Sequence, residues 1–180
     1  KKADFWLMGE VIHGDYSQYI ADHLLHSVTN YELHKGLYSG HNDHNYFEIA
    51  HSIRRQFDQN GGIYRGTFLY SFVDNHDVDR IASKLVNKEH IYPVFTLLFT
   101  LPGIPSIYYG SEWGIEGRKE GPNDDFLRPA VEIGSISRQV QQEKLTQWVR
   151  ALARIHTSRP ELAYGVYREL FLTNRQYAFA

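Results

Sequence analysis

Short apolar runs alternate with amphipathic stretches along most of this chain. The runs predict four strands, over residues 4–11, 27–31, 67–73 and 104–109. The first run is continuously apolar, which is typical of a parallel strand that is covered on both faces. Helical spacing separates and follows the runs, over residues 16–25, 32–37, 45–59, 78–86, 91–101 and 138–157. The repeated order of strand and helix predicts an α/β fold with parallel strands and right-handed crossovers.

Polar, glycine and proline residues mark where these elements end. A polar break is expected at residues 39–44, and Gly61-Gly62 and Pro160 are expected to end the helices before them. The helix over 45–59 is expected to bury one stripe of side chains, Phe47, Ile49, Ala50, Ile53 and Phe57. The last long helix should bury Leu145, Trp148, Val149, Leu152 and Ile155. Residues 164–180 change character and predict two antiparallel strands.

The composition is that of a globular protein and excludes several classes. The 180 residues are 42% hydrophobic and 14% aromatic, so a sizeable core is expected and disorder is not. A formal net charge of −2, without basic runs, gives no indication of a nucleic-acid or membrane partner. Cysteine is absent, which excludes disulfides and thiolate chemistry and fits a reducing, cytoplasmic compartment without requiring one. The localisation therefore stays open.

Polar side chains follow two of the predicted strands directly. Glu10 ends the first strand, and Asp74, Asn75, His76 and Asp77 end the third. Sites in parallel α/β folds assemble at the carboxyl ends of strands, and two carboxylates delivered there are the minimal equipment for acid-assisted cleavage of a glycosidic bond. Asp and Asn are also favoured helix caps, so a purely structural role for these groups is the competing interpretation.

These segments resemble those of a known family in their residue sequences and in their order along the chain. The chain is similar to the α-amylase family, glycoside hydrolase family 13, through Gly9-Glu10-Val11, Ser27–Tyr31, Phe72–Asp77 and Gly103–Glu112. The resemblance implies a partial (β/α)8 TIM barrel, units five to eight, over residues 1–160. Residues 161–180 would begin the antiparallel β-rich C-terminal domain. Periodicity alone does not choose between such a barrel half and an open sheet.

The resemblance also implies roles for individual residues. Glu10 corresponds to the general acid/base, and Asp77 to the carboxylate that stabilises the oxocarbenium-like sugar. His76 corresponds to a residue that binds the sugar, and His13 to one on the leaving-group side. No cofactor and no metal ligand are expected among these residues. A calcium site, if the parent enzyme has one, would lie in the missing part of the barrel.

The implied activity is hydrolysis of α-glucosidic linkages in starch or maltooligosaccharides with retention, which also needs a carboxylate nucleophile. The remaining candidates lie in predicted loops or helices, and none follows a buried strand with an arginine partner. They are Asp15, Asp22, Asp43, Asp124 and Asp125. We therefore expect the isolated chain to be inactive. The alternatives are an α-glucan transglycosidase or isomerising relative, and a non-catalytic fragment that binds carbohydrate or a partner. Unpaired sheet edges also predict self-association or pairing with the missing half-barrel.

Overall fold

The computed structural model describes residues 5–132, 134 and 140–180. Four short strands are present, β1 (Met8–Gly9), β2 (Ser27–Val28), β3 (Tyr70–Phe72) and β4 (Ile104–Ser106). The helices that follow them are α1 (Tyr31–Asn42), α2 (Tyr46–Phe57), α3 (Ile81–Lys84), α4 (Ile91–Thr100), α6 (Val140–Ser158) and α7 (Pro160–Tyr164). Single 3₁₀ turns are η1 (Tyr16–Tyr19), η2 (Lys88–His90) and η3 (Ser111–Trp113).

The four strands are parallel and lie in chain order. Met8 pairs with Ser27 between β1 and β2, and Tyr70 pairs with Ile104 between β3 and β4. One bridge, between Thr29 and Tyr70, joins the two pairs. The strand–helix alternation predicted from the hydropathy pattern is confirmed as an α/β fold, while its assignment to barrel units five to eight stays a prediction.

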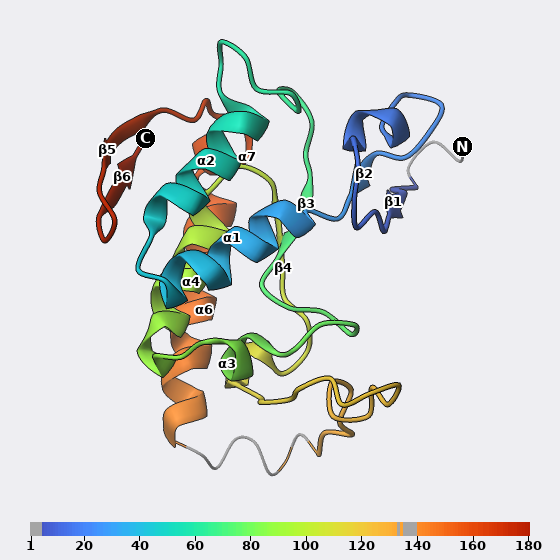
Figure 1. Ribbon diagram of the computed structural model, residues 1–180, viewed down its shortest axis with the longest axis vertical. Helices are drawn as coiled ribbons and strands as arrows, with labels where there is room; N and C mark the ends of the chain where they lie inside the picture. Colours follow the sequence, from blue (N-terminus) through green and yellow to red (C-terminus); the bar gives the residue numbers. More distant parts are fainter. Residues whose placement is uncertain (1–4, 133, 135–139) are drawn as a thin grey trace.

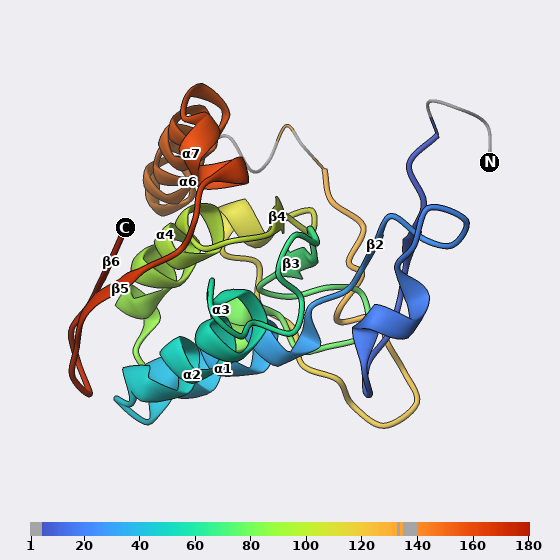
Figure 2. The ribbon, with the colours of Figure 1, turned by 90° about the horizontal axis from the view of Figure 1, so that it is seen from above.

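A layer of helices covers one side of the strands (Figures 1 and 2). Within this layer α1 packs on α2 and α4, and α4 packs on α6. The core between helices and strands contains fully buried apolar side chains from both, among them Val28, Leu33, Ile49, Leu69 and Phe95. Burial of these side chains is what fixes the helices, because isolated helices of this length are marginal in water.

The start of α1 is anchored by a reciprocal pair of buried amides. Asn30 Nδ2 donates to Gln56 Oε1 at 2.8 Å, and Gln56 Nε2 donates back to Asn30 Oδ1 at 3.0 Å. The same Asn30 oxygen accepts from the backbone N–H of Leu33, as a helix N-cap does. The Asn30 backbone N–H donates to the carbonyl of Tyr70 in β3 at 2.8 Å. This one residue therefore fixes where α1, α2 and β3 meet.

The predicted polar break at residues 39–44 begins too early, since α1 continues to Asn42 and only residues 43–45 separate it from α2. Gly40 lies against α2, where a Cβ atom would stand 2.9 Å from Ile49 Cγ1. The Asn42 side chain faces the protein: it donates to the carbonyl of Lys84 and accepts from the N–H of Val86, both at 2.9 Å. Gly40 and Asn42 therefore serve close packing and tertiary hydrogen bonds within α1, and the turn is confined to residues 43–45.

The predicted helix over 16–25 is also wrong, because only η1 forms. Asp15 caps this turn by accepting from Ser17 N at 3.0 Å. Beyond the turn, the backbone N–H of Ala21 donates to the carbonyl of Leu25, so the chain doubles back. The predicted helix over 78–86 shortens to α3, whose first N–H is bound by a side chain described below.

The expectation that the first strand is covered on both faces is wrong for the described residues. Phe5 and Trp6 are 60% and 47% exposed, and the strand that pairs with this segment is β2. Three predicted core residues are also largely exposed on their helices, Phe47, Trp148 and Ile155. Of the predicted helix 138–157, residues 138 and 139 lie outside the described residues, as residue 4 does for the first strand.

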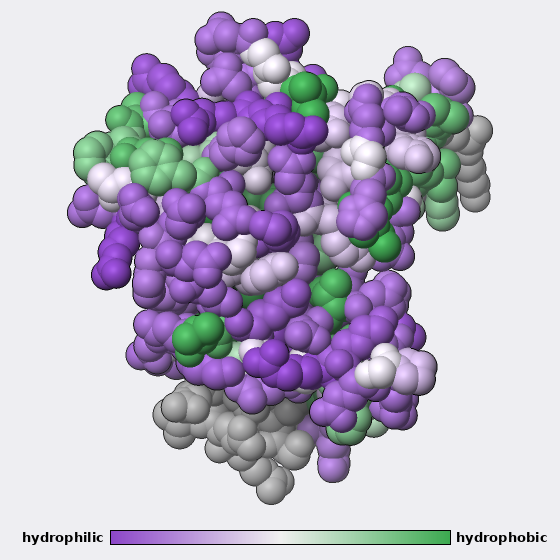
Figure 3. All heavy atoms as spheres, viewed as in Figure 1, coloured by the Kyte–Doolittle hydropathy of each residue, from purple (hydrophilic) through white to green (hydrophobic). Residues whose placement is uncertain are grey.

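The tail forms the two predicted antiparallel strands, β5 (Glu169–Leu172) and β6 (Tyr177–Phe179). Pro160 does not only end α6; it also opens α7, which spans the predicted boundary between residues 160 and 161. The hairpin exposes Leu170 and Phe171, and Figure 3 shows apolar side chains gathered over it on a mostly hydrophilic face. Among the described residues, none of the helices has the length and apolarity that crossing a bilayer requires.

Candidate active site

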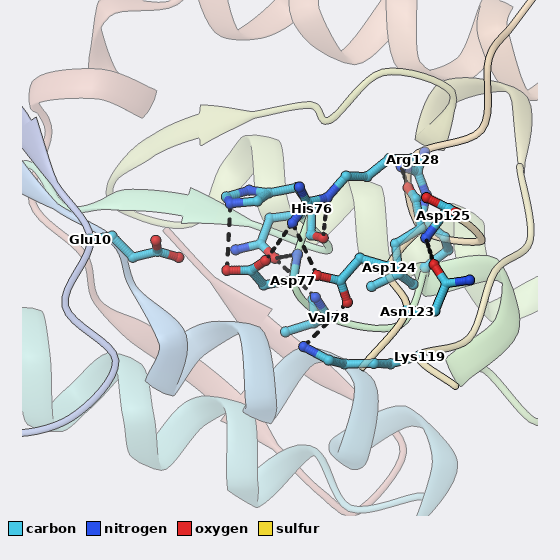
Figure 4. A network of polar contacts seen from close by, with 12 residues as sticks. Glu10, His76, Asp77, Val78, Lys119, Asn123, Asp124, Asp125 and Arg128 are labelled. Atoms are coloured by element: carbon cyan, nitrogen blue, oxygen red, sulfur yellow. Dashed lines mark hydrogen bonds and ion pairs between the residues drawn. The ribbon is translucent and has the colours of Figure 1, made fainter. Parts of the chain in front are cut away.

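Three of the predicted site residues come together at the carboxyl ends of β1 and β3. Glu10 directly follows β1, while His76 and Asp77 follow the extended end of β3. One oxygen or nitrogen atom from each of the three side chains lies within 4.8 Å of the corresponding atoms of the others. Figure 4 shows the Glu10 carboxylate pointing toward His76 and Asp77. These groups therefore lie on the same side of the fold, as expected for residues at the carboxyl ends of parallel strands.

Asp77 is held by a basic side chain from the loop after β4. Arg128 Nη2 donates to Asp77 Oδ1 at 2.9 Å, and Arg128 Nε donates to the His76 carbonyl at 3.1 Å (Figure 4). The same guanidinium contacts Asp124 Oδ2 at 3.2 Å. His76 Nε2 lies 3.4 Å from Asp77 Oδ2. These contacts fix the direction of the Asp77 carboxylate while about 39% of its side chain stays exposed to a ligand.

Glu10 is linked to the loop after β3 through a tyrosine. The Tyr31 hydroxyl donates to Glu10 Oε1 at 2.7 Å and accepts from Asn75 Nδ2 at 2.9 Å. Asn75 Oδ1 in turn accepts from the backbone N–H groups of Asp77 and Val78. Burial, together with the hydrogen bond to Glu10, raises the pKa of Tyr31 to about 12. Tyr31 therefore stays a hydrogen-bond donor throughout the neutral pH range.

The structural interpretation holds for Asp74, which is buried. Asp74 Oδ2 accepts from the N–H of Ile81, the first residue of α3, at 2.7 Å, and lies 3.5 Å from Arg80 Nε. Burial raises the pKa of the Asp74 carboxyl, and the Arg80 guanidinium opposes that shift. Ser111 completes the set by donating to Asp74 Oδ1. The Asp74 carboxylate therefore caps the start of α3 inside the protein. Of the charged or titratable groups after β3, His76 and Asp77 are the ones that face solvent.

The group of Glu10, His76 and Asp77 also has the donor types that a divalent cation accepts. Asp77 Oδ1 already accepts the charged hydrogen bond from Arg128, and a cation would have to displace that bond or share the carboxylate. An exposed acid, a half-exposed acid and an imidazole serve sugar hydroxyls equally well. The group therefore fits a ligand that carries hydroxyl groups as well as a cation.

His13 and Asp77 both line a groove of about 1000 Å³, but His13 is exposed and is not one of the three residues whose polar atoms converge. Its leaving-group role stays a prediction. Two residues that contact the site were given no role in it from the sequence, Tyr31 and Arg128. Tyr31 opens α1 three positions after β2 ends, so its place near the carboxyl end of a parallel strand is the signal that could have found it. Arg128 belongs to a long loop, where no local pattern indicates which charge reaches the site.

Comparison with known proteins identifies the family of this chain. Residues 1–160 match the family model described as "Alpha amylase, catalytic domain". A cyclomaltodextrin glucanotransferase and an alpha-amylase, both of Niallia circulans, are each 28% identical over 109 residues, or 61% of this chain. The aligned part is 14% and 19% of these two relatives.

Solved structures agree with the family model. The crystal structure of an Anoxybacillus alpha-amylase superposes with a TM-score of 0.77 at 26% identity, covering 99% of this chain and 38% of the amylase. The chain thus spans well under half of the enzymes that it resembles. Since the family model matches most of its length, the chain belongs to the α-amylase family, whose members act on α-glucans.

Proposed function

We propose that this chain supplies the acid/base part of an active site that hydrolyses α-glucosidic linkages in starch or maltooligosaccharides with retention. The observation that carries the proposal is the convergence of Glu10, His76 and Asp77 within 4.8 Å at the ends of β1 and β3. Membership of the α-amylase family supports it. The enclosing barrel, of which this chain would form units five to eight, is part of the same proposal.

Each side chain has a chemical task in this mechanism. Glu10 in its acid form gives its proton to the glycosidic oxygen as the bond from C1 to that oxygen breaks. In the second step the Glu10 carboxylate takes a proton from the attacking water. Asp77, fixed by Arg128, binds sugar hydroxyls and stabilises the positive charge that develops on the ring. His76 binds the same sugar, and His13 would contact the leaving group.

The nucleophilic carboxylate is proposed to lie outside these residues. Asp15 is engaged in capping η1, and Asp124 is bound to Arg128 and Lys119. Asp43 follows the last turn of α1. None of these carboxylates follows a strand of the sheet. The chain alone should therefore bind an α-glucan without cleaving it.

Transfer of glucan to a sugar acceptor is the second candidate function. Several of the relatives that match this chain carry the name cyclomaltodextrin glucanotransferase, which denotes transfer. Both reactions use the same acid/base group, and they differ in whether water or a sugar hydroxyl accepts the glucosyl unit. Products longer than the substrate would distinguish transfer from hydrolysis in a complete enzyme.

The test combines binding and turnover of maltoheptaose by the purified 180-residue chain. We expect binding without products, and Asp77→Asn should weaken binding by about tenfold because a charged hydrogen-bond acceptor is lost. Asp125→Asn, which changes an exposed carboxylate of the neighbouring loop, is the matched control and should leave binding unchanged. Equal binding by both variants would refute the site. Turnover that Glu10→Gln abolishes would refute the proposed absence of the nucleophile.

A further inference from the structure

Glu10, His76 and Asp77 form a mixed set of oxygen and nitrogen donors that solvent reaches. Glu10 is exposed, and the side chains of His76 and Asp77 are 47% and 39% exposed. One donor atom of each residue lies within 4.8 Å of the donor atoms of the other two (Figure 4). Two carboxylates and an imidazole are donors that Zn²⁺ and related transition-metal ions accept, whereas Mg²⁺ and Ca²⁺ prefer oxygen alone. The chemistry of this set therefore suits a transition-metal ion.

The distance between two of these donor atoms is that of two ligands of one tetrahedral ion. His76 Nε2 lies 3.4 Å from Asp77 Oδ2, which is too long for a strong hydrogen bond. Two ligands that each lie about 2.1 Å from a tetrahedral Zn²⁺ are separated by about 3.4 Å. The Glu10 donor atom is within 4.8 Å of the other two, so a shift of about 1.4 Å completes the third contact. Glu10 is exposed, and its side chain has the rotational freedom for that shift.

Neighbouring side chains hold one oxygen of each carboxylate and leave the other for the ion. Arg128 Nη2 donates to Asp77 Oδ1 at 2.9 Å, so Oδ2 is the oxygen beside His76. Tyr31 donates to Glu10 Oε1 at 2.7 Å, which leaves Oε2. Hydrogen bonds of this kind orient the carboxylates that bind metal ions. Because Tyr31 is a neutral donor, its bond does not offset the charge of Glu10, and a cation beside that carboxylate is stabilised.

We propose that Glu10, His76 and Asp77 bind a divalent transition-metal ion of the Zn²⁺ type, and that this ion takes the place of the sugar. A water molecule completes the four ligands. The ion occupies the same donor atoms that proton transfer and sugar binding need, so it inhibits the complete enzyme. The exclusion of the sugar rests on the proposed function, whereas the metal site itself rests on the geometry of the three side chains.

The experiment is a calorimetric titration of the full 180-residue chain with Zn²⁺ at pH 7, and with Mg²⁺ as the comparison ion. We expect a Zn²⁺ site and no binding of Mg²⁺ at the same concentrations, because Mg²⁺ prefers oxygen ligands to imidazole. His76→Gln and Asp77→Asn should each weaken Zn²⁺ binding at least about tenfold, since loss of a residue that only orients a ligand already costs that much. His13→Gln is the matched control and should leave the affinity unchanged, because it removes an exposed imidazole that lies outside the converging set.

Three results overturn the metal site. Equal binding of Mg²⁺ and Zn²⁺ means that carboxylates attract cations without selection. An equal loss of Zn²⁺ affinity in His76→Gln and His13→Gln means that the ion binds exposed histidines in general. Unchanged affinity in both His76→Gln and Asp77→Asn means that the ion binds elsewhere on the chain.

A second titration, in the presence of maltoheptaose, tests the exclusion of the sugar. Saturating sugar should weaken Zn²⁺ binding, by the same factor by which Zn²⁺ weakens sugar binding. Equal Zn²⁺ affinity with and without bound maltoheptaose overturns the exclusion. A chain that does not bind maltoheptaose at all contradicts the proposed function instead, and the titration without sugar still decides whether the metal site exists.

Discussion

Two buried histidines predict that this protein loses stability steeply in mild acid. Burial lowers the pKa of His34 to about 3 and that of His41 to about 4, from an ordinary value of 6.5. Both side chains are almost completely buried. His41 Nδ1 is bonded to the carbonyl of Leu37 at 2.6 Å, while its Nε2 has no partner. Neither ring can take up a proton without placing a charge in the core.

The sign of the effect follows from which state binds more protons. Below pH 6.5 the unfolded chain protonates both histidines, whereas the folded chain does not until pH 4 and pH 3. Stability therefore falls as the pH drops through this window. Between pH 7 and pH 5 each histidine should remove about 2 kcal/mol, or about 4 kcal/mol together. That is a large part of the 5–15 kcal/mol or so that is typical of a folded domain.

The assay is urea unfolding followed by circular dichroism at pH 7, 6 and 5, at a single protein concentration because association would shift apparent stability. His34→Phe and His41→Phe replace each ring by one of similar shape that does not titrate. Each variant should lose about 2 kcal/mol less than the unmodified chain between pH 7 and pH 5, and the double variant about 4 kcal/mol less. Loss of a hydrogen bond in a variant lowers the free energy of unfolding by the same amount at every pH, so it cancels when pH 7 and pH 5 are compared. If the double variant and the unmodified chain show the same loss, the argument from burial is refuted.

Three further predictions concern the site and the assembly. Glu10→Gln should lower the pKa of Tyr31 from about 12, since the charged acceptor is removed; NMR titration of labelled tyrosine measures this, and an unchanged value would contradict the hydrogen bond. Arg80→Met should destabilise the fold by about 3–5 kcal/mol, because Asp74 is left buried without its cation. Urea unfolding measures this loss, and Asp74→Asn combined with Arg80→Met should recover part of it. The exposed apolar side chains of the first strand and the β5–β6 hairpin predict self-association, so a monodisperse monomer in sedimentation would contradict that expectation.

The parts of this protein that local pattern determines were predictable. Strand order, the long helices and the strand-end positions of Glu10 and Asp77 follow from hydropathy period and from the rule that parallel strands direct their carboxyl ends to one side. The helix break at residues 39–44 was predicted to begin too early because Gly40 serves contact with α2, which local composition does not reveal. Arg128 was not predicted for the same reason, since 51 positions separate it from Asp77.

The contact between Glu10 and the end of β3 needs an intermediary, and its identity follows from strand spacing. Neighbouring strands lie about 4.8 Å apart, so β1 and β3 are separated by about twice that distance across β2. Side-chain atoms of Glu10 and Asp77 within 4.8 Å of each other must both lean over the end of β2. Tyr31 follows β2 at that point, and its hydroxyl occupies the intervening position with one hydrogen bond to each side, to Glu10 and to Asn75. Tyr31, which comes after the middle strand, therefore sets the relative position of the polar groups at the ends of β1 and β3.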